Sequence, residues 1–155
     1  MALVVLVLAG CEAPTEDEAP PADEEAPPAE EVPAAEVEVG PEGPAQIDDG
    51  GITEIPDDPE LIEEGEALFR ANGCSACHAV EVDQIVVTGP SLVGVTERRQ
   101  PEWIARMILA PGEMLDLDPT AQEMLAEYMV IMPDQNLSVE EVRAIMAYLG
   151  TLLEP

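Results

Sequence analysis

Cys74-Ser75-Ala76-Cys77-His78 is the stretch around which this 155-residue chain is built. Two thiols separated by two residues, with a histidine directly after the second, form the C-x-x-C-H pattern of covalent haem attachment. Each thiol adds to one vinyl group of the porphyrin, and the adjacent imidazole supplies the proximal ligand of the iron. His78 is the chain's one histidine, so no other residue offers an imidazole. The stretch predicts one covalently bound haem.

Two other kinds of site use the same cysteine spacing. A zinc knuckle needs four ligands, usually from a second Cys or His pair, and the only further cysteine is the distant Cys11. A redox-active dithiol is expected near a βαβ pattern, which the surrounding sequence lacks. Haem attachment is therefore the favoured interpretation.

The composition is strongly acidic and limits the possible partners. The formal net charge is −29, there is no lysine, and the five arginines all lie after residue 69. Such a chain is repelled by nucleic acid, and its folded part favours a redox partner with a basic docking surface. The length argues for one domain plus additional sequence.

The first eleven residues predict export and a lipid anchor. Residues 2–9 are apolar, too few to span a bilayer, and they end in Gly10-Cys11. This arrangement resembles a bacterial lipoprotein signal, with residues 1–10 removed and Cys11 lipidated. No Lys or Arg precedes the apolar run, which departs from that pattern. A plain signal peptide with an incidental cysteine is the alternative. Either way, the protein is expected outside the cytoplasm, and lipidation would anchor it to a membrane.

Residues 11–57 are predicted to be a disordered tether. Between Glu12 and Glu60 there are 18 acidic residues, many prolines and no basic residue, so little apolar surface is available to offset chain entropy. A solvated spacer is the favoured interpretation, and an acidic docking arm is the alternative.

The remaining residues, 58–155, predict an all-α domain. Asp58 and Pro59 suit the start of a helix, which Asn72-Gly73 would end. Further helices are expected over 101–109, stopping before Pro111, and from Pro119 to about Met129. Ser138 and Glu141 form a capping-box pattern at the start of a last helix. No segment of this domain gives a convincing strand pattern.

Several features of the domain resemble the class I c-type cytochromes. Gly65 and Phe69 match the glycine and aromatic of that family's first helix, and Tyr148 matches the aromatic of its last helix. The segment 89–94 is similar to the family's G-P-x-L-x-G. The resemblance implies a small helical domain around one haem c, in which the carbonyl of Pro90 orients His78.

The resemblance also implies a distal ligand. Met132-Pro133 stands where the family supplies a methionine to the iron, just before the last helix. Core packing of Met132 and ligation by the nearby Met129 are the alternatives. Trp103, the only tryptophan, is expected beside the haem edge. Three arginines either neutralise the propionates or are solvated: Arg98, Arg99 and Arg106.

A haem ligated by His78 and Met132 leaves no open iron position, which suits a one-electron carrier rather than an enzyme. The resemblance implies such a carrier, tethered to a membrane, monomeric or attached to a respiratory complex, and exchanging electrons with respiratory-chain partners. Two alternatives remain. One is a fixed haem subunit of a respiratory or denitrification complex, and the other is a haem enzyme with a labile Met132.

Overall fold

The computed structural model describes residues 40–86 and 88–153. Their elements, in chain order, are α1 (Pro59–Ala71), the 3-10 turn η1 (Cys74–Ala76), α2 (Val95–Arg98), α3 (Pro101–Leu109), α4 (Pro111–Leu117), α5 (Pro119–Tyr128) and α6 (Val139–Leu149). Within these residues there is no strand, only an isolated β-bridge between Gly40 and Gly43. The all-α prediction is therefore confirmed for the described domain.

The helix starts follow the local signals in the sequence. The Asp58 carboxylate accepts a hydrogen bond from the Glu60 amide, with Pro59 as the first residue of α1. Asp118 caps α5 in the same way, through the Ala121 amide. Ser138 and Glu141 form both halves of a capping box at α6. These three predicted starts are confirmed.

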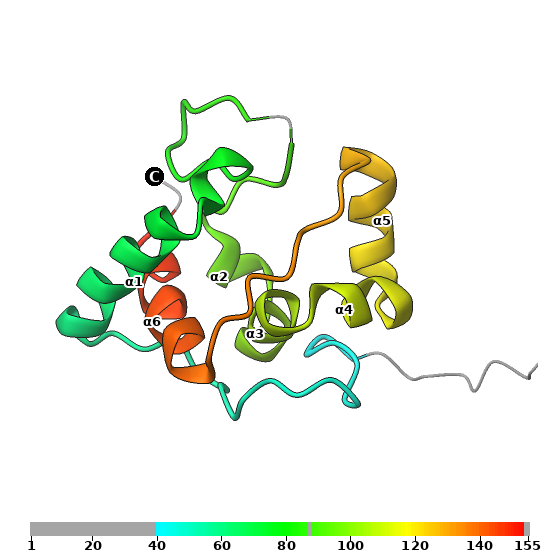
Figure 1. Ribbon diagram of the computed structural model, residues 1–155, viewed down its shortest axis with the longest axis horizontal. Helices are drawn as coiled ribbons and strands as arrows, with labels where there is room; N and C mark the ends of the chain where they lie inside the picture. Colours follow the sequence, from blue (N-terminus) through cyan, green and yellow to red (C-terminus); the bar gives the residue numbers. More distant parts are fainter. Residues whose placement is uncertain (1–39, 87, 154–155) are drawn as a thin grey trace, which may run out of the picture. The chain divides into compact units, whose positions relative to one another are not determined.

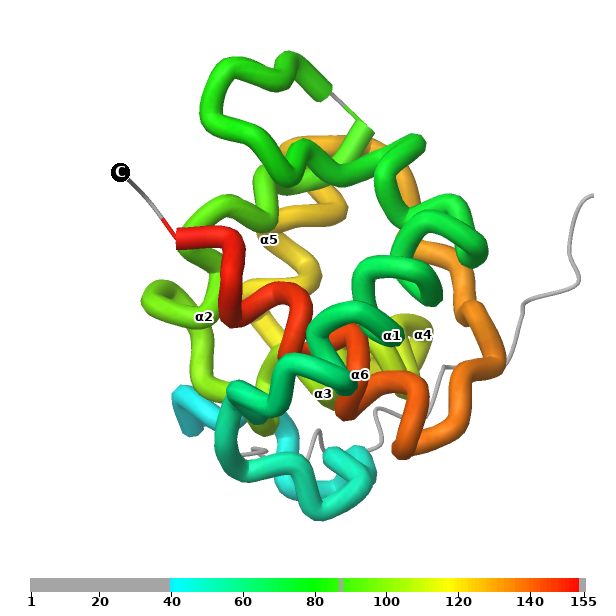
Figure 2. The backbone as a smooth tube through the Cα atoms, turned by 90° about the vertical axis from the view of Figure 1, so that its left-hand side faces the viewer, coloured from blue at the N-terminus to red at the C-terminus, as the bar shows by residue number. Residues whose placement is uncertain are grey.

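Helices α1 and α6 cross each other at close range (Figures 1 and 2). Gly65 makes the approach possible, because a Cβ there would lie 1.9 Å from the carbonyl oxygen of Ala144. One turn further along α1, the rings of Phe69 and Tyr148 pack with their centroids 5.4 Å apart. The aromatic residues that the resemblance identified in the first and last helices therefore meet where these helices cross.

Helix α4 was not predicted. Pro111 was expected to end the preceding helix, but it is the first residue of a new one. Proline is well suited to that position, since its missing amide hydrogen is not needed there. The short helices α4 and α5 lead the chain to the far side of the core. From there residues 129–138 cross back to α6 in front of α3 (Figure 1).

The folded domain begins earlier than residue 58, which corrects the predicted boundary. Residues 40–57, which we call the strap, pack on the domain, and Ile47 and Ile52 are only 2% and 0% exposed. The strap lies along α6: a Cβ at Gly50 would lie 2.7 Å from Val139 at its start, and a Cβ at Gly150 would lie 2.6 Å from Ile55 at its end. The predicted tether is thus not disordered over residues 40–57.

The remaining N-terminal predictions concern residues outside the described part of the chain. They are the signal segment 1–10, the lipidation site Cys11 and the tether over 11–39. Within the described part, no helix combines the length and apolar character needed to cross a membrane.

Candidate functional site

A cavity of about 230 Å³ opens between η1, α3, α5 and the segment that leads into α6. Most of its wall is hydrophobic, with Phe69 from α1, Ile104 and Ile108 from α3, and Ile145 and Leu149 from α6. Four side chains with chemically distinctive atoms line the same cavity: Cys74, Cys77, His78 and Met132. The fold therefore brings two thiols, an imidazole and a thioether to one apolar space.

The two thiols lie at and directly after the 3-10 turn η1. Gly73, with φ at 71°, turns the chain out of α1, and the amide of Cys77 then donates to the carbonyl of Cys74. Both cysteines are free thiols of intermediate exposure. Burial has the largest effect on the Cys74 thiol and raises its pKa; a backbone hydrogen bond lowers that pKa, and the nearby Cys77 raises it.

The imidazole of His78 is oriented by a main-chain carbonyl. Its Nδ1 lies 2.8 Å from the carbonyl oxygen of Pro90. A carbonyl only accepts, so Nδ1 carries the proton and donates, which leaves the Nε2 lone pair free for a metal. The expected hydrogen bond between these residues is thus present. It fixes the tautomer that an iron ligand needs.

The loop that carries Pro90 is itself held in place. The amide of Leu92 donates to the carbonyl of Ala79 at 2.9 Å, which ties the loop to the residue after His78. The guanidinium of Arg98 donates to the carbonyls of Ser91 and Val93 from the other side. The sequence analysis offered a propionate partner or a solvated side chain for Arg98, and no sequence pattern indicated its bonds to this loop.

Gly89 is a further site residue that the sequence showed only as part of a turn. A Cβ at this position would lie 2.9 Å from the carbonyl oxygen of Cys77 and 3.1 Å from Cε1 of His78. The first contact is shorter than real Cβ atoms show and the second is tighter than most, so glycine lets the loop close directly over the imidazole. The packing of the ring depends on Gly89 as much as its hydrogen bond depends on Pro90.

The two candidate methionines differ sharply in their surroundings. Met132 is half-buried, packs against the hydrophobic core and lines the cavity. Met129 is 84% exposed and is not among the cavity-lining residues. It ends α5 in a left-handed conformation, with φ at 56°, and so redirects the chain towards the cavity. This geometry favours Met132 over Met129 as the thioether ligand.

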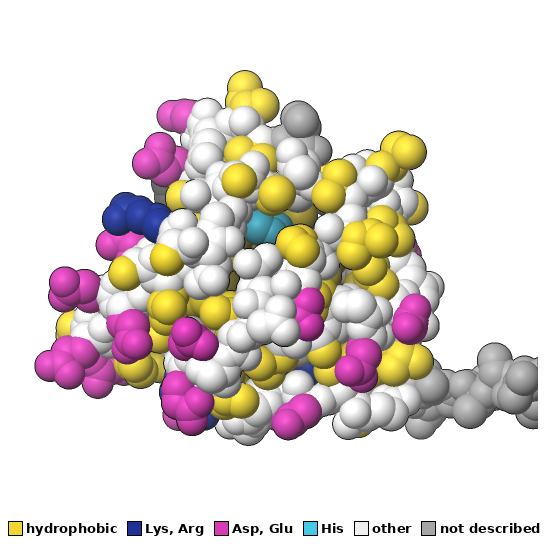
Figure 3. Space-filling view, in the orientation of Figure 1, with side chains coloured by type: hydrophobic (Ala, Val, Ile, Leu, Met, Phe, Trp, Pro, Cys, Tyr) yellow, Lys and Arg dark blue, Asp and Glu magenta, His cyan; other side chains and the backbone are white. Residues whose placement is uncertain are grey.

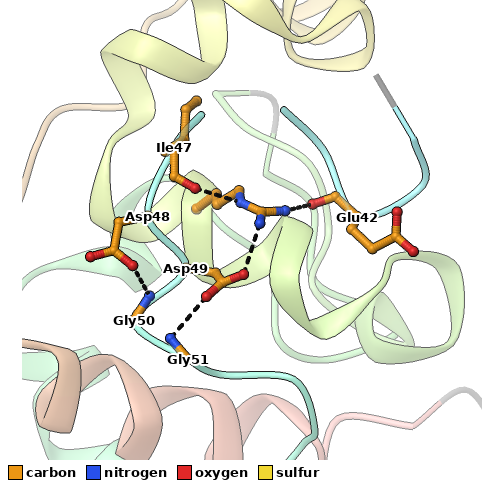
Figure 4. A network of polar contacts seen from close by, with 7 residues as sticks. Glu42, Ile47, Asp48, Asp49, Gly50 and Gly51 are labelled. Atoms are coloured by element: carbon orange, nitrogen blue, oxygen red, sulfur yellow. Dashed lines mark hydrogen bonds and ion pairs between the residues drawn. The ribbon is translucent and has the colours of Figure 1, made fainter. Parts of the chain in front are cut away.

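Trp103 and two of the three arginines lie at the cavity. Trp103 is buried and lines the wall, and the guanidinium carbon of Arg99 lies 5.2 Å from the centre of its ring. Arg98 and Arg99 also line the cavity, whereas Arg106 does not. The guanidinium of Arg106 is bound to the strap instead (Figure 4).

The donor set and the apolar wall fit the covalent haem that the C-x-x-C-H pattern predicts. Two thiols are placed to bind the vinyl groups, and an imidazole whose Nδ1 faces the Pro90 carbonyl follows them directly. A thioether reaches the same space from another part of the chain. Figure 3 shows the imidazole at the floor of a hollow, with mainly hydrophobic side chains next to it. Among residues 40–86 and 88–153, no three His, Cys, Asp or Glu side chains are grouped to hold a metal ion.

Comparison with known proteins gives an independent result. No curated protein sequence matches the chain. Among solved structures, cytochrome c from Rhodothermus marinus is 37% identical, with a TM-score of 0.57 over 63% of this chain and 80% of that one. An engineered form of that protein is 35% identical, with a TM-score of 0.56 over 64% and 83%. A further structure of the engineered form, described as bound to a carbene intermediate, is 35% identical, with a TM-score of 0.54 over 64% and 82%.

The family assignment agrees with the geometry. Residues 62–153 match the cytochrome c family, a span that includes both thiols, His78, Pro90 and Met132. With this match over more than half of its length, the chain belongs to the cytochrome c family, whose members bind haem c covalently and use it for electron transfer.

Proposed function

We propose that this protein is a one-electron carrier whose single haem is ligated by His78 and Met132. The observation that carries the proposal is the convergence of the oriented imidazole and the Met132 thioether on one cavity, next to the two attachment thiols. With two protein ligands, the iron has no open position for a substrate. A Met/His pair also favours the reduced state relative to a harder ligand set.

The residues around the cavity have separate tasks in this proposal. Cys74 and Cys77 hold the porphyrin covalently, and Pro90 and Gly89 keep the Nε2 of His78 directed into the cavity. The aliphatic wall from α3 and α6 excludes water, which limits the rearrangement that accompanies a change of redox state. Trp103, Arg98 and Arg99 also line the cavity, so they would supply a donor and positive charge to the propionate groups of a bound haem.

Absorption spectra of both redox states test this ligation. The ferric protein is expected to show the near-infrared band of a methionine–iron bond, and Met132→Ala is expected to abolish it. Met129→Ala is the matched control, because Met129 is exposed and does not line the cavity. A band that survives Met132→Ala, or that disappears in Met129→Ala, would contradict the assignment of Met132.

We also propose that the carrier works outside the cytoplasm on a lipid anchor at Cys11. The Leu-Ala-Gly-Cys pattern of residues 8–11 supports the anchor, and cytochrome c domains are typically extracytoplasmic. In a bacterial host that exports the protein, the wild type is expected in the membrane fraction, with the mass of a diacylglycerol group on Cys11. Cys11→Ser is expected to release it. Equal membrane association of both proteins would contradict the anchor.

The proposed redox partner has an apolar docking centre and a basic rim. Met129, Val130 and Ile131 are exposed where the chain passes the cavity, and Val130 and Ile131 also line it. The acidic surface further out would attract basic side chains, mainly by speeding the encounter. Apolar contact next to the cavity would then bring the partner close to the haem.

A further inference from the structure

Arg106 is a buried cation whose partners all come from the strap. This residue lies on α3 and is 7% exposed. Nε donates to the carbonyl of Ile47 at 2.8 Å, Nη1 to the carbonyl of Glu42, and Nη2 to the carboxylate of Asp49 at 2.7 Å. Figure 4 shows these acceptors converging on one guanidinium from three sides. Because Nε, Nη1 and Nη2 each donate to an acceptor in the strap, Arg106 fixes the path of the strap closely.

Asp49 links the guanidinium to the backbone of the strap. One of its oxygens accepts from Arg106, and the other accepts from the amide of Gly51 at 2.8 Å. Its neighbour Asp48 makes the same kind of turn contact with the Gly50 amide at 2.8 Å but has no bond to Arg106. The two adjacent aspartates therefore differ mainly in the bond to the buried cation.

The strap held by Arg106 lies against Trp103. A Cβ at Gly43 would lie 3.1 Å from Cδ1 of Trp103, 3.6 Å from Cε of Met114 and 3.8 Å from Cδ of Arg106. Gly43 also has φ at 87°, a conformation that other residues adopt only with strain. A backbone without a side chain is thus pressed onto the edge of the indole.

Trp103 connects this contact to the cavity. It stands three residues before Arg106 on α3, so the two side chains lie on neighbouring parts of one helix surface. The indole lines the cavity, while the strap covers its edge at Gly43 and Arg99 lies over its ring. Three groups therefore set the position of this wall: α3, Arg99 and the strap.

We propose that the strap is a latch for the haem pocket and that Arg106 is its positioning residue. Arg106 holds the strap, the strap holds Trp103, and Trp103 keeps water from its side of the cavity. The proposal rests on the haem-carrying function given above. A more hydrated pocket stabilises the more highly charged ferric state, so a loosened latch lowers the midpoint potential without changing a ligand of the iron.

Two matched pairs of variants in the full-length haem-loaded protein test the latch. Gly43→Ala introduces a methyl group against Trp103, and Gly51→Ala introduces one at a similar φ of 68° with nothing within 4 Å. Asp49→Asn removes the charge that binds Arg106, and Asp48→Asn removes the adjacent charge. Midpoint potential and the fluorescence of Trp103, the only tryptophan, are measured after haem content is shown to be equal.

Gly43→Ala and Asp49→Asn are expected to lower the potential and to raise the fluorescence, because haem quenches an indole held beside it. Gly51→Ala and Asp48→Asn are expected to match the wild type in both. Wild-type values in the first two variants, or equal shifts in all four, would overturn the latch. If the wild type carried no haem, the proposed function would fall. In that case, a difference in the Trp103 emission maximum between the Gly43→Ala and Gly51→Ala proteins would still decide whether the strap positions the indole.

Discussion

Gly65 and Ala144 bring the backbones of α1 and α6 into direct contact: a Cβ on Gly65 would overlap the carbonyl oxygen of Ala144 at 1.9 Å. No side chain can rotate away to relieve that overlap, because the obstructing atoms belong to the main chain. Beyond Gly65, α1 carries Phe69, which packs on Tyr148, and then leads into the cysteine-bearing turn η1. The close contact at Gly65 therefore helps to set the position of the haem-attachment turn.

Gly65→Ala should destabilise the protein by about 3 kcal/mol or more, because the two helices must separate to admit a methyl group. Gly112→Ala is the control, since Gly112 lies in α4 with nothing within 4 Å of the added Cβ. It should stabilise the protein by about 0.5–1 kcal/mol through the higher helix propensity of alanine. Denaturant unfolding measures both. A Gly65→Ala protein as stable as Gly112→Ala would show that the helices do not pack as described.

Gly89→Ala should displace the imidazole of His78 and weaken its bond to Pro90, because the methyl group would lie 3.1 Å from Cε1 and 3.2 Å from Nδ1. A weaker hydrogen bond makes the imidazole a poorer donor to ferric iron, so the midpoint potential should rise. Pro90→Ala is the contrasting variant, since the acceptor is a main-chain oxygen that alanine retains. A potential that responds to Pro90→Ala but not to Gly89→Ala would contradict this account.

The capping box of α6 should add a pH-dependent part to stability. Hydrogen bonds from the backbone and hydroxyl of Ser138 lower the pKa of Glu141 from its usual 4.5. A lowered folded-state pKa contributes stability that is complete above about pH 4.5 and is lost as pH falls through the folded value. The melting-temperature difference between wild type and Glu141→Gln should therefore be largest near neutral pH and shrink below pH 4.5. Glu140→Gln, which removes a neighbouring first-turn carboxylate outside the box, is the reference variant for this comparison.

The acidic surface should discriminate between small redox reagents by charge. The segment 61–155 holds 16 acidic and five basic residues, so a cationic reagent is attracted and an anionic one is repelled. Reduction of the ferric protein by hexaammineruthenium(II) should slow as salt rises, and reduction by ferrocyanide should accelerate, since salt screens both interactions. Stopped-flow rates at several ionic strengths measure this. Equal salt dependence for both reagents would show that surface charge does not steer encounters at the haem.

Short-range signals in the sequence predicted most of the helices correctly. Capping is decided within four residues, so Asp58-Pro59 and the Ser138–Glu141 pair mark the starts of α1 and α6 without knowledge of the rest of the fold. Helix α4 was missed because Pro111 was interpreted as a stop, although the same proline suits a first helical position. One local signal was compatible with two outcomes, and tertiary packing selected the second.

The strap was missed for a different reason. Its buried residues Ile47 and Ile52 stand apart among acidic residues, so the segment has the composition of a disordered chain. Its stability comes from contacts with residues more than fifty positions away, and chief among them is Arg106. The available clue was that arginine itself, a lone cation in the otherwise apolar stretch 103–109, which required a partner that the helix could not supply.

The functional site likewise contains features that could be predicted from the sequence and features that could not. The pairing of His78 with Pro90, which the structure contains, was implied by the resemblance of segment 89–94 to the cytochrome family, whereas Gly-Pro by itself indicates only a turn. Gly89 against the ring, and Arg98 across the loop, depend on distances that no sequence pattern encodes. The part of a haem site that follows from covalent chemistry is visible in the sequence, while the part that follows from packing is not.

The strap has a practical consequence for dissecting the protein. The match to the cytochrome c family begins at residue 62, so a fragment trimmed to the family's limits would lack the strap, with Ile55 at Gly150 and with Gly43 at Met114 and the indole edge. Apolar surface that the strap covers would then face solvent, and we expect such a fragment to aggregate. Anyone shortening this chain for crystallisation or electrode work should cut before Gly40.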